Sequence, residues 1–150
     1  MVRRVAWLLA IAGAIPFAVM TFALVGTGNH IRIPAIAALV TYAAVILSFL
    51  GGIEWGLAVH DPVPGPSPQK ERIRAMALFI SAGPSLAAWG VFWLPTPHWQ
   101  LGTSIGLFIL VWAADLGLSR QGLVPSWFVD LRTAITAVVV VILGVALYVL

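Results

Sequence analysis

The segment that says most about this chain is Val45-Ile-Leu-Ser-Phe-Leu-Gly-Gly-Ile-Glu54-Trp-Gly-Leu-Ala-Val59. It closes an apolar run that begins at about Ala35, and its one charged residue is Glu54. A run of this length matches the roughly 20 residues with which an α-helix crosses a bilayer. A carboxylate at the centre of such a helix costs roughly 2.5–3.5 kcal/mol. Glu54 therefore requires a partner, a proton or a function.

Composition places the whole chain in a membrane. Its 150 residues are 61% hydrophobic and 9% charged, whereas soluble domains carry about 25% charged residues. The absence of cysteine excludes disulfides, thiolate metal sites, iron–sulfur clusters and covalently attached haem. The 8 basic residues lie at the ends of the predicted helices, where membrane topology explains them, so no nucleic-acid partner is expected.

The apolar segments predict an all-α, polytopic membrane protein with five transmembrane helices. Short connections, the clearest being the proline-rich 60–68, leave no room for a soluble domain. Residues 1–150 are therefore predicted to form a single integral membrane domain. The predicted helices cover about 5–25, 35–59, 73–94, 99–118 and 133–150.

Orientation follows from the positive charges. With the N-terminus inside and the C-terminus outside, the inner face receives all basic residues but one, namely Arg3, Arg4, Lys70, Arg72, Arg74, Arg120 and Arg132. The outer face receives only Arg32. This positive-inside bias predicts the orientation of a multi-pass membrane protein.

Two features of the helices concern packing. In the second predicted helix, Ser48, Gly52 and Gly56 form a stripe of small residues, which lets another helix approach closely in lipid. Glu54 lies on the opposite face, so this helix is expected to contact neighbours on two sides. In the third, Pro84 of the pair Gly83-Pro84 leaves the Ile80 carbonyl without its helical donor, and a kink is expected there.

Glu54 and Asp115 are predicted to lie in the same leaflet, because each is a few residues from the inner end of its helix, within roughly 5–8 Å of the boundary. The same leaflet holds other candidates for a polar cluster: Arg132, Arg74, His60, Trp55 and Trp112. One interpretation is a buried network of ion pairs. The alternative is a pocket for a lipid headgroup, a quinone or another small amphiphile. A complete proton path is disfavoured, because no ionisable residue continues across the outer half.

No residues indicate catalysis, a metal or a cofactor. The sequence lacks a nucleophile motif, HExxH and a phosphate-binding loop. His30 and His98 fall on the outer side and His60 on the inner side, so two histidines cannot bind a haem between them. The expectation is a protein that is not an enzyme.

Two blocks resemble the domain of unknown function 3429 family, which includes relatives of transmembrane protein 69. The first, Ile46–Gly56, is similar to the family's Leu-Ser-Phe-Leu-Gly-Gly-Ile-His-Trp-Gly core. The second, Pro125-Ser-Trp-Phe-Val-Asp-Leu-Arg-Thr-Ala-Ile-Thr136, is similar to its Pro-x-Trp-Tyr-x-x-Leu-Arg-x-x-Leu-Thr block. Asp115 fits an acidic position in the fourth helix. The resemblance implies a five-helix bacterial inner-membrane protein with mitochondrial relatives, and it implies no activity.

The chain departs from the family at Glu54, where histidine is usual. A hydrogen-bonding or charge-pairing role survives this exchange better than a permanent metal ligand does. The leading hypothesis is a non-enzymatic accessory or assembly component of a membrane complex, in contact with lipids and other membrane subunits. The alternative is a binder of a lipid, quinone or small amphiphile, using the inner-leaflet polar site around Glu54, Asp115 and Arg132.

Overall fold

Helices make up nearly all of the computed structural model, which describes residues 1–26, 29–59, 68–120 and 125–150. Within these ranges there are six helices and no strand, so the predicted all-α class is confirmed. The helices are α1 (Val2–Gly26), α2 (Asn29–Val59), α3 (Pro68–Ser81), α4 (Gly83–Val91), α5 (Pro97–Arg120) and α6 (Ser126–Val149).

Four helical stretches are long and apolar enough to cross a membrane: Val2–Gly26, Ile31–Val59, Pro97–Arg120 and Ser126–Val149. They correspond to the first, second, fourth and fifth predicted segments. Large apolar side chains such as Phe22, Phe79 and Leu86 are exposed on the outside of the bundle, as expected where lipid surrounds the protein.

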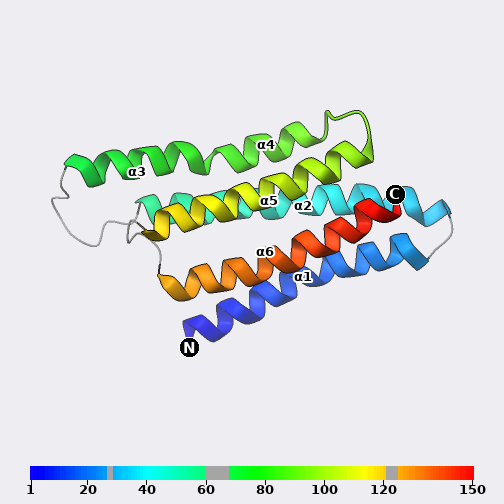
Figure 1. Ribbon diagram of the computed structural model, residues 1–150, viewed down its shortest axis with the longest axis horizontal. Helices are drawn as coiled ribbons and strands as arrows, with labels where there is room; N and C mark the ends of the chain where they lie inside the picture. The colour runs from blue at the N-terminus through cyan, green and yellow to red at the C-terminus, as the bar shows by residue number, and fades with distance from the viewer. Residues whose placement is uncertain (27–28, 60–67, 121–124) are drawn as a thin grey trace.

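The third predicted segment is not one continuous helix, which corrects the prediction of a helix over 73–94. α3 ends at Ser81 and α4 covers Gly83–Val91. Figure 1 shows the two pieces end to end along one side of the bundle. The interruption lies where the kink was expected. Its physical cause is Pro84, which has no N–H to donate to the Ile80 carbonyl.

All the predicted helices begin earlier than expected, most of all α2, at Asn29 instead of 35, and α6, at Ser126 instead of 133. The prediction followed the apolar runs, but backbone hydrogen bonds continue a helix into polar sequence. At α6 the start is set by Pro125, whose backbone is extended (φ −64°, ψ 145°). This earlier start places Arg132 well inside α6.

α2 holds the central place in the bundle. It packs against α1, α3, α4 and α5, whereas α6 packs against α1 and α5 (Figure 1). α2 thus contacts several helices, although its small-residue stripe, which was expected to form one of two contact sides, is exposed. Arg32, near the start of α2, donates hydrogen bonds to the carbonyl oxygens of Val149 and Leu150, which links α2 to the end of α6.

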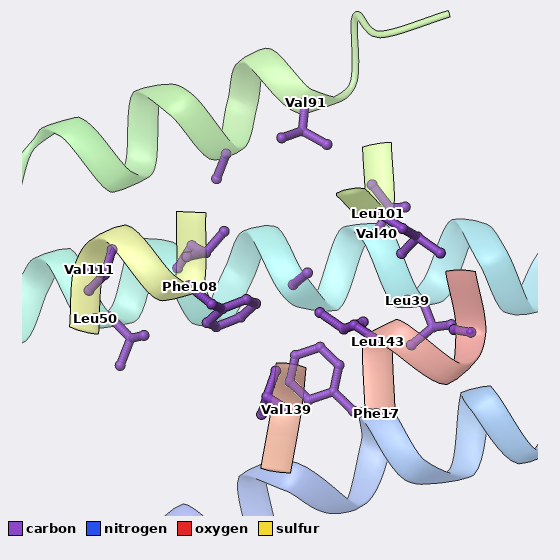
Figure 2. Packing of buried hydrophobic residues seen from close by; sticks show 14 of the residues in the cluster. Phe17, Leu39, Val40, Leu50, Val91, Leu101, Phe108, Val111, Val139 and Leu143 are labelled. Carbon is purple, nitrogen blue, oxygen red and sulfur yellow. The ribbon is translucent and has the colours of Figure 1, made fainter. Parts of the chain in front are cut away.

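The core is an apolar column between the helices. Figure 2 shows Leu39 and Leu143 toward one end of this column, Phe17 and Phe108 at its middle, and Leu50 and Val111 toward the other end. The rings of Phe17 and Phe108 meet edge to face, with their centroids 6.0 Å apart. Such close packing matters in lipid, where van der Waals contact replaces the hydrophobic effect as the force that joins helices.

Candidate functional site

Three buried charged residues continue the core beyond Leu50 and Val111. Glu54 of α2 follows Leu50 by four residues, and Asp115 of α5 follows Val111 by four, so each acid extends the buried face of its helix. Arg132 of α6 is the third member. The exposed fractions are 2% for Glu54, 2% for Asp115 and 6% for Arg132. These three residues are called the polar cluster below.

Asp115 and Arg132 form a buried ion pair. Arg132 Nε donates to Asp115 Oδ2 over 2.6 Å, between α5 and α6. A second polar contact joins the same helices, because Trp112 Nε1 donates to Thr133 Oγ1 over 2.9 Å. Thr133 Oγ1 in turn donates to the Val129 carbonyl over 2.8 Å. Removing one partner of a buried pair leaves an uncompensated charge, so this arrangement fixes how α5 and α6 face each other.

Glu54 is buried to the same degree but is less well satisfied. Its Oε1 is buried and accepts no hydrogen bond from the described residues. The charges that act on it most strongly are those of Asp115 and Arg132. The polar cluster thus contains two carboxylates and one guanidinium, and the guanidinium is already engaged by Asp115. An orphaned buried oxygen of this kind calls for an explanation such as an ion, a water or a ligand.

A cavity of about 420 Å³ lies on the Arg132 side of the polar cluster. Its walls come from α1, α2, α5 and α6 and are mostly apolar, including Leu9, Phe17, Phe49 and Phe108. Arg132 and Thr136 supply its polar side chains. Thr136 Oγ1 is buried and has no hydrogen-bond partner among the described residues. We call this space the Arg132 cavity.

A second cavity, of about 350 Å³, lies on the Glu54 side. It is lined by α2, α5 and the α3–α4 break, the last of which contributes Ile80, Gly83 and Pro84. Glu54 is its only charged lining residue among those that the structure describes. We call this space the Glu54 cavity. The polar cluster therefore touches two separate cavities, with an arginine in one and an acid in the other.

The other predicted cluster residues are distributed differently. Trp112 donates a hydrogen bond to Thr133, the residue that follows Arg132, and so lies close to the ion pair. Arg74 is half-buried on α3. Trp55 is 52% exposed on the outside of α2 and does not join the polar cluster. His60 lies outside the described residues. Across the described part of the chain, no group of three or more His, Cys, Asp or Glu residues is placed to hold a metal ion.

The small-residue stripe of α2 lies on the surface of the chain. Ser48, Gly52 and Gly56 are all exposed, and a Cβ added at Gly52 or Gly56 would meet no atom within 4 Å. The glycine that permits close approach within the chain is instead Gly51, where a Cβ would clash with the Ser81 carbonyl oxygen. The stripe is therefore exposed along its length, and no described atom lies close to where a Cβ would stand at Gly52 or Gly56.

Sequence reasoning missed Thr133 and Thr136, which supply a hydroxyl to Trp112 and a hydroxyl to the Arg132 cavity. Thr136 was open to prediction, because it follows Arg132 by four residues and so shares its helix face. Thr133 had no comparable signal, because its role depends on Trp112 of a different helix.

Comparisons with known proteins agree with this architecture. The family model described as "Protein of unknown function (DUF3429)" matches residues 2–148. Transmembrane protein 69 of Xenopus tropicalis is 35% identical over 133 residues, which make up 88% of this chain and 49% of that protein. The chain thus spans about half the length of this curated relative. No solved structure matches the chain significantly. Because the family match extends over almost the entire chain, we conclude that this membrane protein belongs to the DUF3429 family.

Proposed function

We propose that this protein binds a small neutral amphiphile in the Arg132 cavity. The observation that carries the proposal is a cavity of about 420 Å³ whose apolar walls meet two buried donors, Arg132 and Thr136. Ligand sites in proteins fall in this range, roughly 300–1,000 Å³, and combine apolar walls with a few placed polar groups. Leu9 and Phe49 line the cavity and are themselves exposed on the bundle surface, so a ligand could enter sideways from the lipid.

The polar groups favour a head that accepts hydrogen bonds and carries no charge. Thr136 Oγ1 has a hydrogen to donate, and Arg132 uses only Nε on Asp115. The charge of Arg132 is balanced by Asp115, and Glu54 adds a second negative charge nearby. An anionic head would therefore meet an environment without surplus positive charge. A quinone carbonyl or a lipid ester satisfies the donors without this penalty.

The proposal is tested by binding of a short-chain ubiquinone analogue to the protein in mixed lipid–detergent micelles. Gly13→Leu fills the cavity from α1 and is expected to weaken binding more than about 10-fold. Gly106→Leu is the matched control, because Gly106 faces open space on α5 and lines neither cavity. Thr136→Val is expected to weaken binding by about 5- to 10-fold. Non-saturable binding by the wild type, or equal loss in both leucine variants, would rule the site out.

A second function has its own support, the exposed stripe of Ser48, Gly52 and Gly56 on α2. We propose that this stripe contacts a helix of another subunit, so that the protein acts as a non-enzymatic accessory or assembly component of a membrane complex. Small residues let helix backbones approach closely, which is a main source of helix association in lipid. Gly52→Leu should then shift the gently solubilised protein to monomer size on native gels, while Gly106→Leu should not. A wild type that migrates only as a monomer would contradict this role.

We also infer that α3 and α4 together form a fifth membrane span. We further infer that the protein lies in the cell inner membrane with its N-terminus on the inner side. The support is the bias of basic residues toward one end of the bundle. Because the chain contains no cysteine, single cysteines can report the topology. Thr96→Cys should react with an impermeant maleimide in intact cells, and Gln69→Cys should react only after permeabilisation. The reverse pattern would refute the orientation.

A further inference from the structure

The Glu54 cavity offers a site of different chemistry, and the case begins with its carboxylate. Glu54 is 2% exposed, lines the cavity and has an Oε1 that no described donor reaches. A Cα–Cβ bond in a helix tilts toward the helix N-terminus, so the Glu54 side chain leans back toward the level of Gly51. Gly51 is the residue against which the Ser81 carbonyl lies. The carboxylate is thus directed toward the α3–α4 break.

The break adds oxygen acceptors to the same region. Ile80 and Pro84 both line the cavity, and Pro84 has no N–H for the Ile80 carbonyl. Of the donors nearby, the Ser81 hydroxyl is occupied, because it donates to the Leu78 carbonyl over 2.7 Å. A broken membrane helix in which proline withholds a donor from a carbonyl near an acid resembles the arrangements that bind ions in transporters.

The charges of the polar cluster determine whether a bound ion would be positive or negative. Two carboxylates and one guanidinium leave an excess negative charge in apolar surroundings, and Arg132 is bonded to the other acid. Water in the cavity would satisfy hydrogen bonds without supplying positive charge. A single carboxylate with carbonyl oxygens suits a monovalent cation, since divalent ions call for more charged ligands. We propose that the Glu54 cavity binds one small monovalent cation between Glu54 and the α3–α4 break.

This site is independent of the amphiphile site, because the two cavities share no lining residue. The test is the melting temperature of the purified protein in sodium or potassium chloride, compared with choline chloride at equal ionic strength. Binding that is specific to the folded state should raise the melting temperature saturably, by on the order of 5 °C. Glu54→Gln should abolish this rise. Glu71→Gln, at an exposed acid of α3, is the matched control and should keep it.

Equilibrium binding of radioactive sodium to the wild type should also saturate near one ion per chain. An equal rise in choline chloride, or a rise that persists in Glu54→Gln, would overturn the proposal. If acidification in choline chloride raises the melting temperature and sodium adds nothing, the carboxylate takes a proton only, and the proposal fails. Each outcome is separable from the amphiphile test, which uses a different probe and different variants.

Discussion

Asp115 and Glu54 are two acids with the same burial and opposite surroundings. Each is 2% exposed and follows the apolar core by one helical turn. Asp115 accepts a 2.6 Å bond from Arg132, whereas Glu54 has a buried oxygen without a described donor. Since desolvation is similar for both, the difference lies in what each residue does. A paired acid orients its helices, and an orphaned acid beside a cavity is the better candidate for a ligand.

The helices around the two acids are joined by different forces. On the Asp115 side, α5 and α6 share the ion pair and the bond from Trp112 to Thr133. On the Glu54 side, α2 meets α3 through the close approach of Gly51 to the Ser81 carbonyl. Polar interactions thus join α5 to α6, and a backbone contact joins α2 to α3. Single substitutions can remove either interaction without the other.

The largest expected effect comes from turning Asp115 into a second orphaned acid. Arg132→Met removes the guanidinium but keeps much of the side-chain volume, so Asp115 stays buried without a partner. We expect the free energy of unfolding to fall by about 3–5 kcal/mol, as measured by denaturing-detergent titration in mixed micelles. The double variant Asp115→Asn with Arg132→Met should recover much of this loss. A single variant as stable as the wild type would show that the pair does not hold α5 and α6 together.

Breaking the backbone contact on the other side should cost less. At Gly51 an added Cβ would clash with the backbone oxygen of Ser81, which cannot rotate away. Gly51→Ala should therefore lower the free energy of unfolding by about 1–3 kcal/mol, the usual range for overpacking. Gly52→Ala is the matched control, since a Cβ there meets nothing within 4 Å. The same titration compares them, and equal stability of the two variants would contradict the close approach.

The contrast between Gly51 and Gly52 shows where prediction from the sequence ends. Helical spacing places Gly51 beside Glu54 on one face of this helix, and the structure buries both residues. The sequence also predicts a break at Pro84, because the missing N–H is a property of proline itself. Which neighbour approaches Gly51 depends on the order and rotation of the helices. Those are set by packing between distant segments, for which one sequence carries no local signal.

The same limit applies to the polar cluster. Topology brings the ends of the second and fourth predicted helices and the start of the fifth to one leaflet, so the meeting of Glu54, Asp115 and Arg132 could be predicted. The choice of Arg132 as the partner of Asp115 could not be predicted, because Arg74 and Arg120 were expected on the same inner face as Arg132. The two cavities could not be predicted from the sequence either, because a cavity depends on how completely side chains fill the space between helices.

Substituting Trp112 should have a smaller effect on the contact between α5 and α6 than breaking the ion pair. Trp112→Phe keeps an aromatic ring but removes the Nε1–H that donates to Thr133 Oγ1. Thr133 still donates to the Val129 carbonyl, so its oxygen is not left without a bond. We expect a loss of about 1 kcal/mol in the free energy of unfolding. Trp55→Phe, at an exposed tryptophan, should change stability by less than about 0.5 kcal/mol. An equal effect in both variants would show that the hydrogen bond adds nothing.

Glu54→Gln should have the smallest effect on stability, and this makes it the sharpest test of the comparison. In the absence of sodium and potassium, removing the charge relieves desolvation and repulsion from Asp115, while attraction to Arg132 is lost. We expect these contributions to cancel to within about 1 kcal/mol, because no hydrogen bond to Oε1 is broken. Asp115→Asn, which also removes one buried charge, should cost several times more because it leaves Arg132 buried without a counter-charge. If Glu54→Gln proves as destabilising as Asp115→Asn under these conditions, Glu54 is a structural partner of Arg132, and the division between a paired acid and a ligand-facing acid is wrong.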